Sequence, residues 1–203
     1  GIGTGVWIDA LAKIEDPGPA VVLPFIFGAA FPIGVRIWDG ASTFHRGVPS
    51  SIATGLLLGA GEGIGIAGAS ALHTTADENK LSFGANASIA WATMMGGGVG
   101  GFFFGQWLEP DPRSLGFIAS AAGWGAASGL LFGVGVSAAG KNSADNSWKV
   151  GSVSGLVGYN LGIVATGALS AVYVPSYTAQ EYMWIGYTAG TAAGCVPWIF
   201  YAF

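Results

Sequence analysis

Large and small side chains alternate along much of this chain. Between Ser51 and His73 nearly every odd position is small, and the bulky residues stand at even positions: Ile52, Leu56, Leu58, Ile64, Ile66 and Leu72. A period of two is typical of a β-strand, whose successive side chains point to opposite faces. Because Gly61-Glu62-Gly63 interrupts the stretch at its centre, we predict a hairpin whose arms, about ten residues each, cross a bilayer when tilted.

The apolar segments recur along the chain with a spacing of about 33 residues. Polar stretches rich in turn formers separate them. Two of the segments align without gaps at an offset of 66 residues, which places Gly59 with Gly125 and Gly63 with Gly129. We therefore predict one integral membrane domain, residues 1–203, built from a repeated unit that is either a β-hairpin or a spanning helix with its loop.

The end of the chain adds a second indication of strands. Ile199, Tyr201 and Phe203 stand at alternate positions, and this ending resembles the terminal strand signature of bacterial outer-membrane β-barrel proteins. With the alternation, the resemblance predicts an all-β transmembrane barrel of about 12 short antiparallel strands built from hairpin repeats. The resemblance also implies a location in the bacterial outer membrane.

The alternative fold is an all-α bundle of about six transmembrane helices packed through glycine zippers. Each apolar segment is long enough for a spanning helix, and small residues recur at every fourth position, as in Gly55, Gly59 and Gly63. Every fourth position is also every second position taken twice, so this spacing fits both folds. A bundle would belong to an inner membrane, where Lys and Arg gather on one side, but here alternate loops divide them almost evenly.

Composition limits the function. Charged residues make up 9% of the chain and hydrophobic residues 52%, which indicates contact with a lipid bilayer. The net charge of −4 and the scattered cations argue against a nucleic-acid partner. We predict no catalytic, cofactor-binding or metal site, because His45 and His73 lack further ligands at metal spacing, and Ser50 and Ser51 near His45 do not make a triad.

The predicted role is therefore non-enzymatic: a structural or porin-like component that packs against partner subunits, as a homo- or hetero-oligomer, through its Gly and Ala faces. The alternative role is a multi-pass helical protein, either an ion-coupled transporter or a membrane subunit of a larger complex.

Three residues are candidates for polar interior or turn positions: Glu62, Asn160 and Arg36. In a hairpin Glu62 would be the tip of a turn in water, whereas in a spanning helix a carboxylate at mid-membrane depth would be a proton or ion site. Asn160 occupies the centre of a later segment, where it would form a turn or an interior hydrogen bond. Arg36 lies in the small-residue register of its segment and would face a barrel interior.

Overall fold

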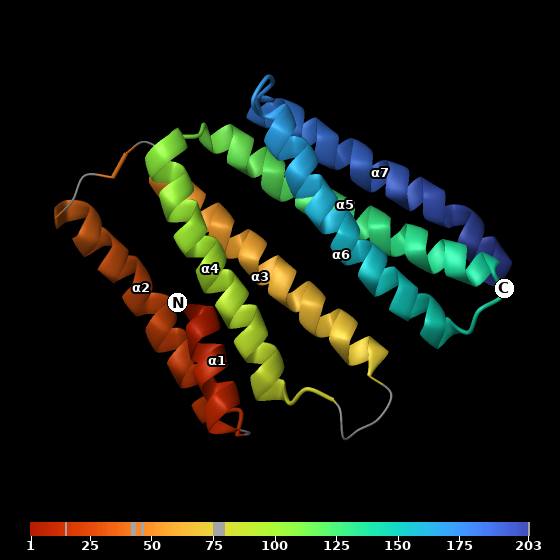
Figure 1. Ribbon diagram of the computed structural model, residues 1–203, viewed down its shortest axis with the longest axis horizontal. Coiled ribbons are helices and arrows are strands. Elements are labelled where there is room, and N and C mark those ends of the chain that lie inside the picture. Colours follow the sequence, from red (N-terminus) through yellow and green to blue (C-terminus); the bar gives the residue numbers. More distant parts are fainter. Residues whose placement is uncertain (15, 42–43, 46, 75–79, 203) are drawn as a thin grey trace.

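All regular secondary structure among the residues that the structure describes is helical. The computed structural model describes residues 1–14, 16–41, 44–45, 47–74 and 80–202, without the side chains of residues 39, 41 and 196–202. Figure 1 shows the order of the elements: α1 (Ile2–Ala12), the 3₁₀ turn η1 (Pro19–Val21), α2 (Val22–Ala41), α3 (Val48–His73), α4 (Phe83–Leu108), α5 (Pro112–Ala139), α6 (Ala144–Leu169) and α7 (Tyr177–Ala202).

The predicted β-barrel is therefore wrong, and the alternative of a helical bundle is the better description. Residues 51–73, taken above as a hairpin, lie within α3. The resemblance to outer-membrane barrels fails as well, because Ile199 and Tyr201 lie in α7, whereas Phe203 is outside the described residues. The porin-like role and the outer-membrane location were inferred from the barrel, so neither has any remaining support.

Two helix interfaces on α3 explain why its sequence imitates a strand. Gly55, Gly59 and Gly63 face α4, and a Cβ atom on any of them would overlap atoms of that helix. Gly61 and Gly65 each follow one of these glycines by two positions but face α6, against Tyr159 and Leu156. Each interface requires a small residue at every fourth position, and the two sets are offset by two. Together, the two sets place a small residue at nearly every second position, so large and small side chains alternate within a helix.

The bundle is built from two helix pairs, α3 with α4 and α5 with α6, in which the backbones touch. In the first pair Gly55 lies against the backbone of Gly97, and Gly59 against that of Thr93. The second pair repeats this arrangement with Gly125 against Gly158 and Gly129 against Ser154. In lipid, where apolar surface gains nothing by leaving the solvent, such close packing is a main source of helix association.

These contacts define how the two pairs correspond. Gly55 of α3 corresponds to Gly125 of α5, and Gly97 of α4 to Gly158 of α6, because each glycine of one pair meets its partner in the same way as in the other. The sequence alignment had matched Gly59 with Gly125, which is one helical turn away. A zipper with a four-residue period looks alike after such a shift, so only the contacts fix the register.

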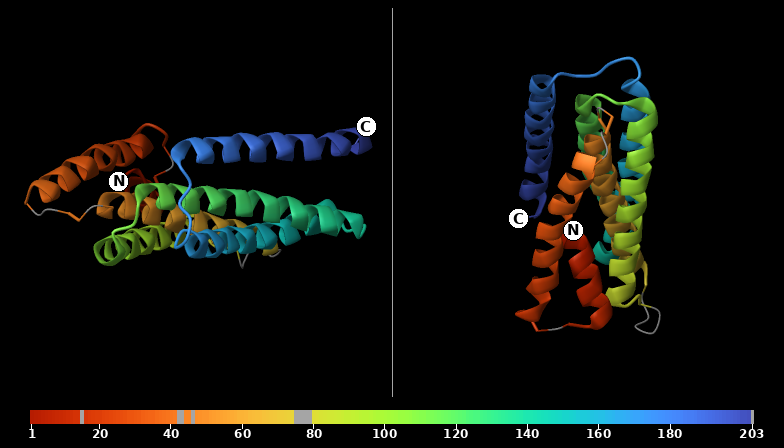
Figure 2. Two further views of the ribbon diagram at one scale, coloured as in Figure 1. Left: turned by 90° about the horizontal axis from the view of Figure 1, so that it is seen from above. Right: turned by 90° about the vertical axis from the view of Figure 1, so that its left-hand side faces the viewer.

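The remaining helices cover one side of the four zipper helices (Figure 2). The short helix α1 packs between α2 and α4, and α7 lies along α5. Trp184 Nε1 of α7 donates to Ser120 Oγ at 2.9 Å, and the Tyr187 hydroxyl donates to the Trp124 carbonyl at 3.0 Å. Side chains of α2 such as Phe25, which is 78% exposed, have few contacts within the chain and are suited to lipid.

Among the described residues, five helical segments are long and apolar enough to cross a membrane: η1 with α2, α3, α4, α5 and α6, with mean hydropathies of 1.2 to 2.0 over their most apolar windows. Helices of 26 residues, such as α3 and α4, exceed the roughly 20 that a bilayer requires. The protein is a multi-pass helical membrane protein.

The zipper contacts predict that neighbouring glycines of α4 differ sharply in their tolerance of a methyl group. Gly97→Ala should lower the free energy of unfolding by about 1–3 kcal/mol, because its Cβ would overlap the Gly55 carbonyl oxygen. Gly96→Ala is the matched control: a Cβ at Gly96 meets nothing within 4 Å, and alanine has the higher helix propensity. Reversible unfolding in micelles, followed by circular dichroism, measures both. Equal effects of the two substitutions would contradict the zipper interface.

Candidate functional site: a carboxylate inside the bundle

Glu62 lies near the midpoint of α3, at the interface with α6. Its two neighbours in sequence are glycines with different partners: Gly63 lies against Ala90 and Thr93 of α4, and Gly61 lies against the ring of Tyr159. The small residues on either side bring both neighbouring helices close to this part of α3. The Glu62 side chain is half-buried, so the hairpin interpretation, in which it was the tip of a turn in water, does not apply.

Asn160 of α6 is the hydrogen-bond partner of Glu62. Its Nδ2 donates to Glu62 Oε2 at 2.9 Å and to the carbonyl oxygen of Leu156, one turn earlier in α6, at 3.0 Å. A carboxylate deep in a membrane is costly unless it is paired, and a hydrogen bond to an ionised group is about twice as strong as one between neutral groups. Two residues that were singled out separately in the sequence therefore form one site.

Tyr159 provides a second polar link between the same helices. Its hydroxyl donates to the carbonyl oxygen of Leu58 at 2.7 Å, one turn before Glu62 on α3. The ring lies directly over Gly61, where an added Cβ would come within 2.5 Å of the Tyr159 hydroxyl oxygen. Gly61 is therefore small in order to admit Tyr159, which positions α6 beside Glu62.

A groove of about 710 Å³ runs between the two helix pairs toward this site. At one end it is lined by Leu108, Pro110 and Asp111, where α4 ends and α5 begins. At the other end it reaches Leu58 on α3 and Ile163 on α6, each about one turn from the Glu62–Asn160 pair. The walls between are mainly apolar, with Ser51, Thr54 and Ser114 among the polar exceptions. The groove thus connects the helix ends with the level of the Tyr159 hydroxyl group.

The structure does not bring Arg36 to this site. Arg36 lies on α2, which packs mainly against α1, and its side chain is exposed. The basis for an interior position was the small-residue register of a barrel strand, which does not exist. His45 is also apart from the site, in a hydrogen-bonded pair with Glu109 at 2.7 Å between Nδ1 and Oε1. Among the described residues, no group of three or more His, Cys, Asp or Glu side chains could hold a metal ion.

Two residues near the polar centres of the structure, Tyr159 and Asp9, are not among the candidates predicted from the sequence. Tyr159 was not singled out, since an aromatic side chain in an apolar segment carries no distinctive signal. Asp9 was missed although a signal was present: like Glu62, it is a single acid within an apolar run, here Ile2–Ala12. It lies in a separate cavity and is described below.

Comparison with protein-family models, with curated proteins and with solved structures finds no match for this chain.

The Tyr159 bond predicts a measurable loss of stability. Tyr159→Phe removes only the hydroxyl group and leaves the Leu58 carbonyl without this donor, so the free energy of unfolding should fall by about 0.5–1.5 kcal/mol, the range of interhelical hydrogen bonds in membranes. Tyr182→Phe on α7 is the control, because that side chain is 68% exposed. Unfolding in bicelles measures both variants. A loss for Tyr182→Phe as large as that for Tyr159→Phe would contradict the role of the bond.

Proposed function

We propose that this protein translocates protons across an energy-transducing inner membrane, with Glu62 as the group that binds and releases the proton. The observation that carries the proposal is the hydrogen bond of 2.9 Å between Asn160 Nδ2 and Glu62 Oε2, formed halfway along two spanning helices. An ionisable side chain at that depth is expensive to maintain, and in membrane proteins such residues line ion and proton pathways.

The chemistry of the pair suits a proton. A carboxylate takes up a proton on a single oxygen, whereas a metal ion requires several oxygen ligands around it. The Asn160 amide can hydrogen-bond to Glu62 in both its ionised and its protonated form, because its Nδ2 donates to a carboxylate as well as to the carbonyl oxygen of a carboxylic acid. Protonation would remove the charge and with it the cost of exposing Glu62 to an apolar surrounding.

The groove that leads toward Glu62 provides one half of a pathway for protons. The groove between the helix pairs would bring water from the α4–α5 connection to the level of Leu58. One turn of α3 separates this level from Glu62, and the Tyr159 hydroxyl group is bonded there to the Leu58 carbonyl oxygen. Movement of one helix pair against the other would open this separation, as in transporters whose repeated halves rock around a site at the bilayer midplane.

A role as a membrane subunit of a larger complex is the second candidate, and one observation favours it. The Asn160 side chain is exposed in the single chain although it lies at mid-membrane depth. A polar amide facing lipid would be unfavourable, so a partner helix covering it would stabilise the site. In that case the same carboxylate would act at a subunit interface. The chain remains predicted not to be an enzyme in either role.

Substitution of Glu62 tests the proposal. The protein is reconstituted in liposomes loaded with a pH-sensitive dye. A potassium diffusion potential should then drive protons through the protein into the liposomes, which the dye reports. Glu62→Gln keeps the shape and the acceptor for Asn160 but cannot ionise, so uptake should fall to the level of protein-free liposomes. Glu181→Gln on the outer surface of α7 is the matched control and should retain the flux.

The result also separates the two candidates. Flux that survives Glu62→Gln, or an unmodified protein that moves no protons, would contradict translocation by the isolated chain. If flux is absent but the chain elutes with tightly bound partner subunits from its native membrane, the subunit role is supported.

A further inference from the structure

Asp9 is the most deeply buried acid of the described chain. It lies in the last turns of α1 and is 7% exposed. Both carboxylate oxygens are shielded from water, and neither has a hydrogen-bond partner among the described residues. An ionised carboxylate without partners inside a protein costs several kcal/mol, and no described side chain supplies the donor or cation that would offset this cost.

The only cation of the described chain near Asp9 does not neutralise it. Lys13 lines the same cavity, one turn further along, but its backbone is in the left-handed region at φ 53°, where α1 ends, and its side chain is exposed. No ion pair joins it to Asp9 within the part of the chain that the structure describes. The carboxylate is thus left with acceptor capacity for external N–H donors.

Asp9 lines a cavity of about 570 Å³ between α1 and the start of α4. This volume is many times that of a water molecule, which occupies about 30 Å³ in the liquid. Most of the wall is apolar, formed by Val6, Leu11, Ile14, Ala20 and Phe83. The cavity therefore combines one negative group with a large surface for an apolar body.

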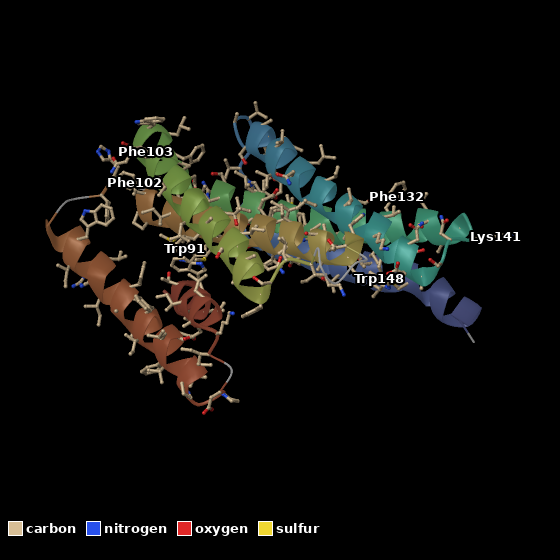
Figure 3. All side chains as sticks on the ribbon, turned by 60° about the horizontal axis from the view of Figure 1, so that its bottom comes forward. Trp91, Phe102, Phe103, Phe132, Lys141 and Trp148 are labelled. Atoms are coloured by element: carbon tan, nitrogen blue, oxygen red, sulfur yellow. The ribbon has the colours of Figure 1, made fainter. Side chains whose placement is uncertain are left out.

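A stacked pair of tryptophans beside the cavity holds α1 on α4. Trp7 of α1 stacks on Trp91 of α4 with ring centroids 4.1 Å apart, and Figure 3 shows Trp91 directed toward α1. Trp7 Nε1 donates to Ser88 Oγ at 3.0 Å, and Trp91 Nε1 donates to Thr4 Oγ1 at 3.2 Å. These bonds hold α1 on α4 on either side of the stack. The cavity therefore lies beside a well-defined contact between α1 and α4, to which its lining residue Ser88 belongs.

From these observations we infer that the Asp9 cavity binds an organic ammonium ion, a protonated amine with an apolar alkyl or aryl body. Because both carboxylate oxygens are covered in the structure, binding requires the Asp9 side chain to turn toward the cavity. There its oxygens accept from the ammonium N–H groups, and the apolar body fills the cavity against Leu11, Ile14 and Phe83. The site is at the end of α4 opposite to the groove that leads to Glu62, so it does not depend on the proposed proton translocation.

Paired probes test the charge recognition. Phenethylammonium and phenylethanol have nearly the same size and differ in charge, and their binding to the full chain in nanodiscs at neutral pH is measured by calorimetry. A charged hydrogen bond predicts that phenethylammonium binds at least about tenfold more tightly. Equal affinities, or no binding of either probe, would overturn the inference.

Substitutions locate the site. Asp9→Asn should abolish the preference for the charged probe, so that the two probes bind with about equal affinity. Binding of phenylethanol to this variant reports that the cavity is intact. Asp145→Asn, at a carboxylate that is 71% exposed on α6, is the matched control and should leave the preference unchanged. Lys13→Gln should leave the affinity unchanged, because the exposed Lys13 side chain makes no ion pair with Asp9. A preference that survives Asp9→Asn places the recognition elsewhere and overturns the inference.

Discussion

The structure depends on direct contact between helix backbones at glycine. In lipid there is no hydrophobic force that drives one apolar helix onto another, so the association of α3 with α4 and of α5 with α6 relies on dispersion contacts at short range. Gly55 against Gly97, and Gly125 against Gly158, bring the paired backbones close enough for such contacts. A methyl group at these positions would separate the helices and reduce the contact along their whole length.

The two tight pairs leave one interface of a different character, that between α3 and α6. There the small residues of α3 receive side chains instead of a backbone: Tyr159 over Gly61, and Leu156 over Gly65. Polar bonds accompany this packing, from Tyr159 to Leu58 and from Asn160 to Glu62. The polar chemistry of the bundle centre thus lies where the two rigid pairs meet, which is the interface that a relative movement of the pairs would change.

Part of this could be predicted from the sequence. Composition and the spacing of polar stretches indicate a membrane protein and the limits of its spanning segments, and Glu62 and Asn160 stand out as polar residues within apolar segments. The type of secondary structure could not be obtained from the alternation, because two four-residue zippers offset by two residues produce the same pattern as a strand. The pairing of Glu62 with Asn160 and the isolation of Arg36 depend on which helices are neighbours, and a single sequence does not contain that information.

The correspondence between the two helix pairs has a consequence for stoichiometry. Shifted by the register of the zipper contacts, Glu62 corresponds to Phe132 of α5, and Asn160 to Val99 of α4. Both counterparts face outward, with exposed fractions of 71% and 55%, and Figure 3 shows Phe132 at the surface of α5. The pseudosymmetry of the two helix pairs is therefore broken in its chemistry: within the described residues the duplicated architecture carries this acid–amide couple once, because its counterpart positions hold apolar side chains.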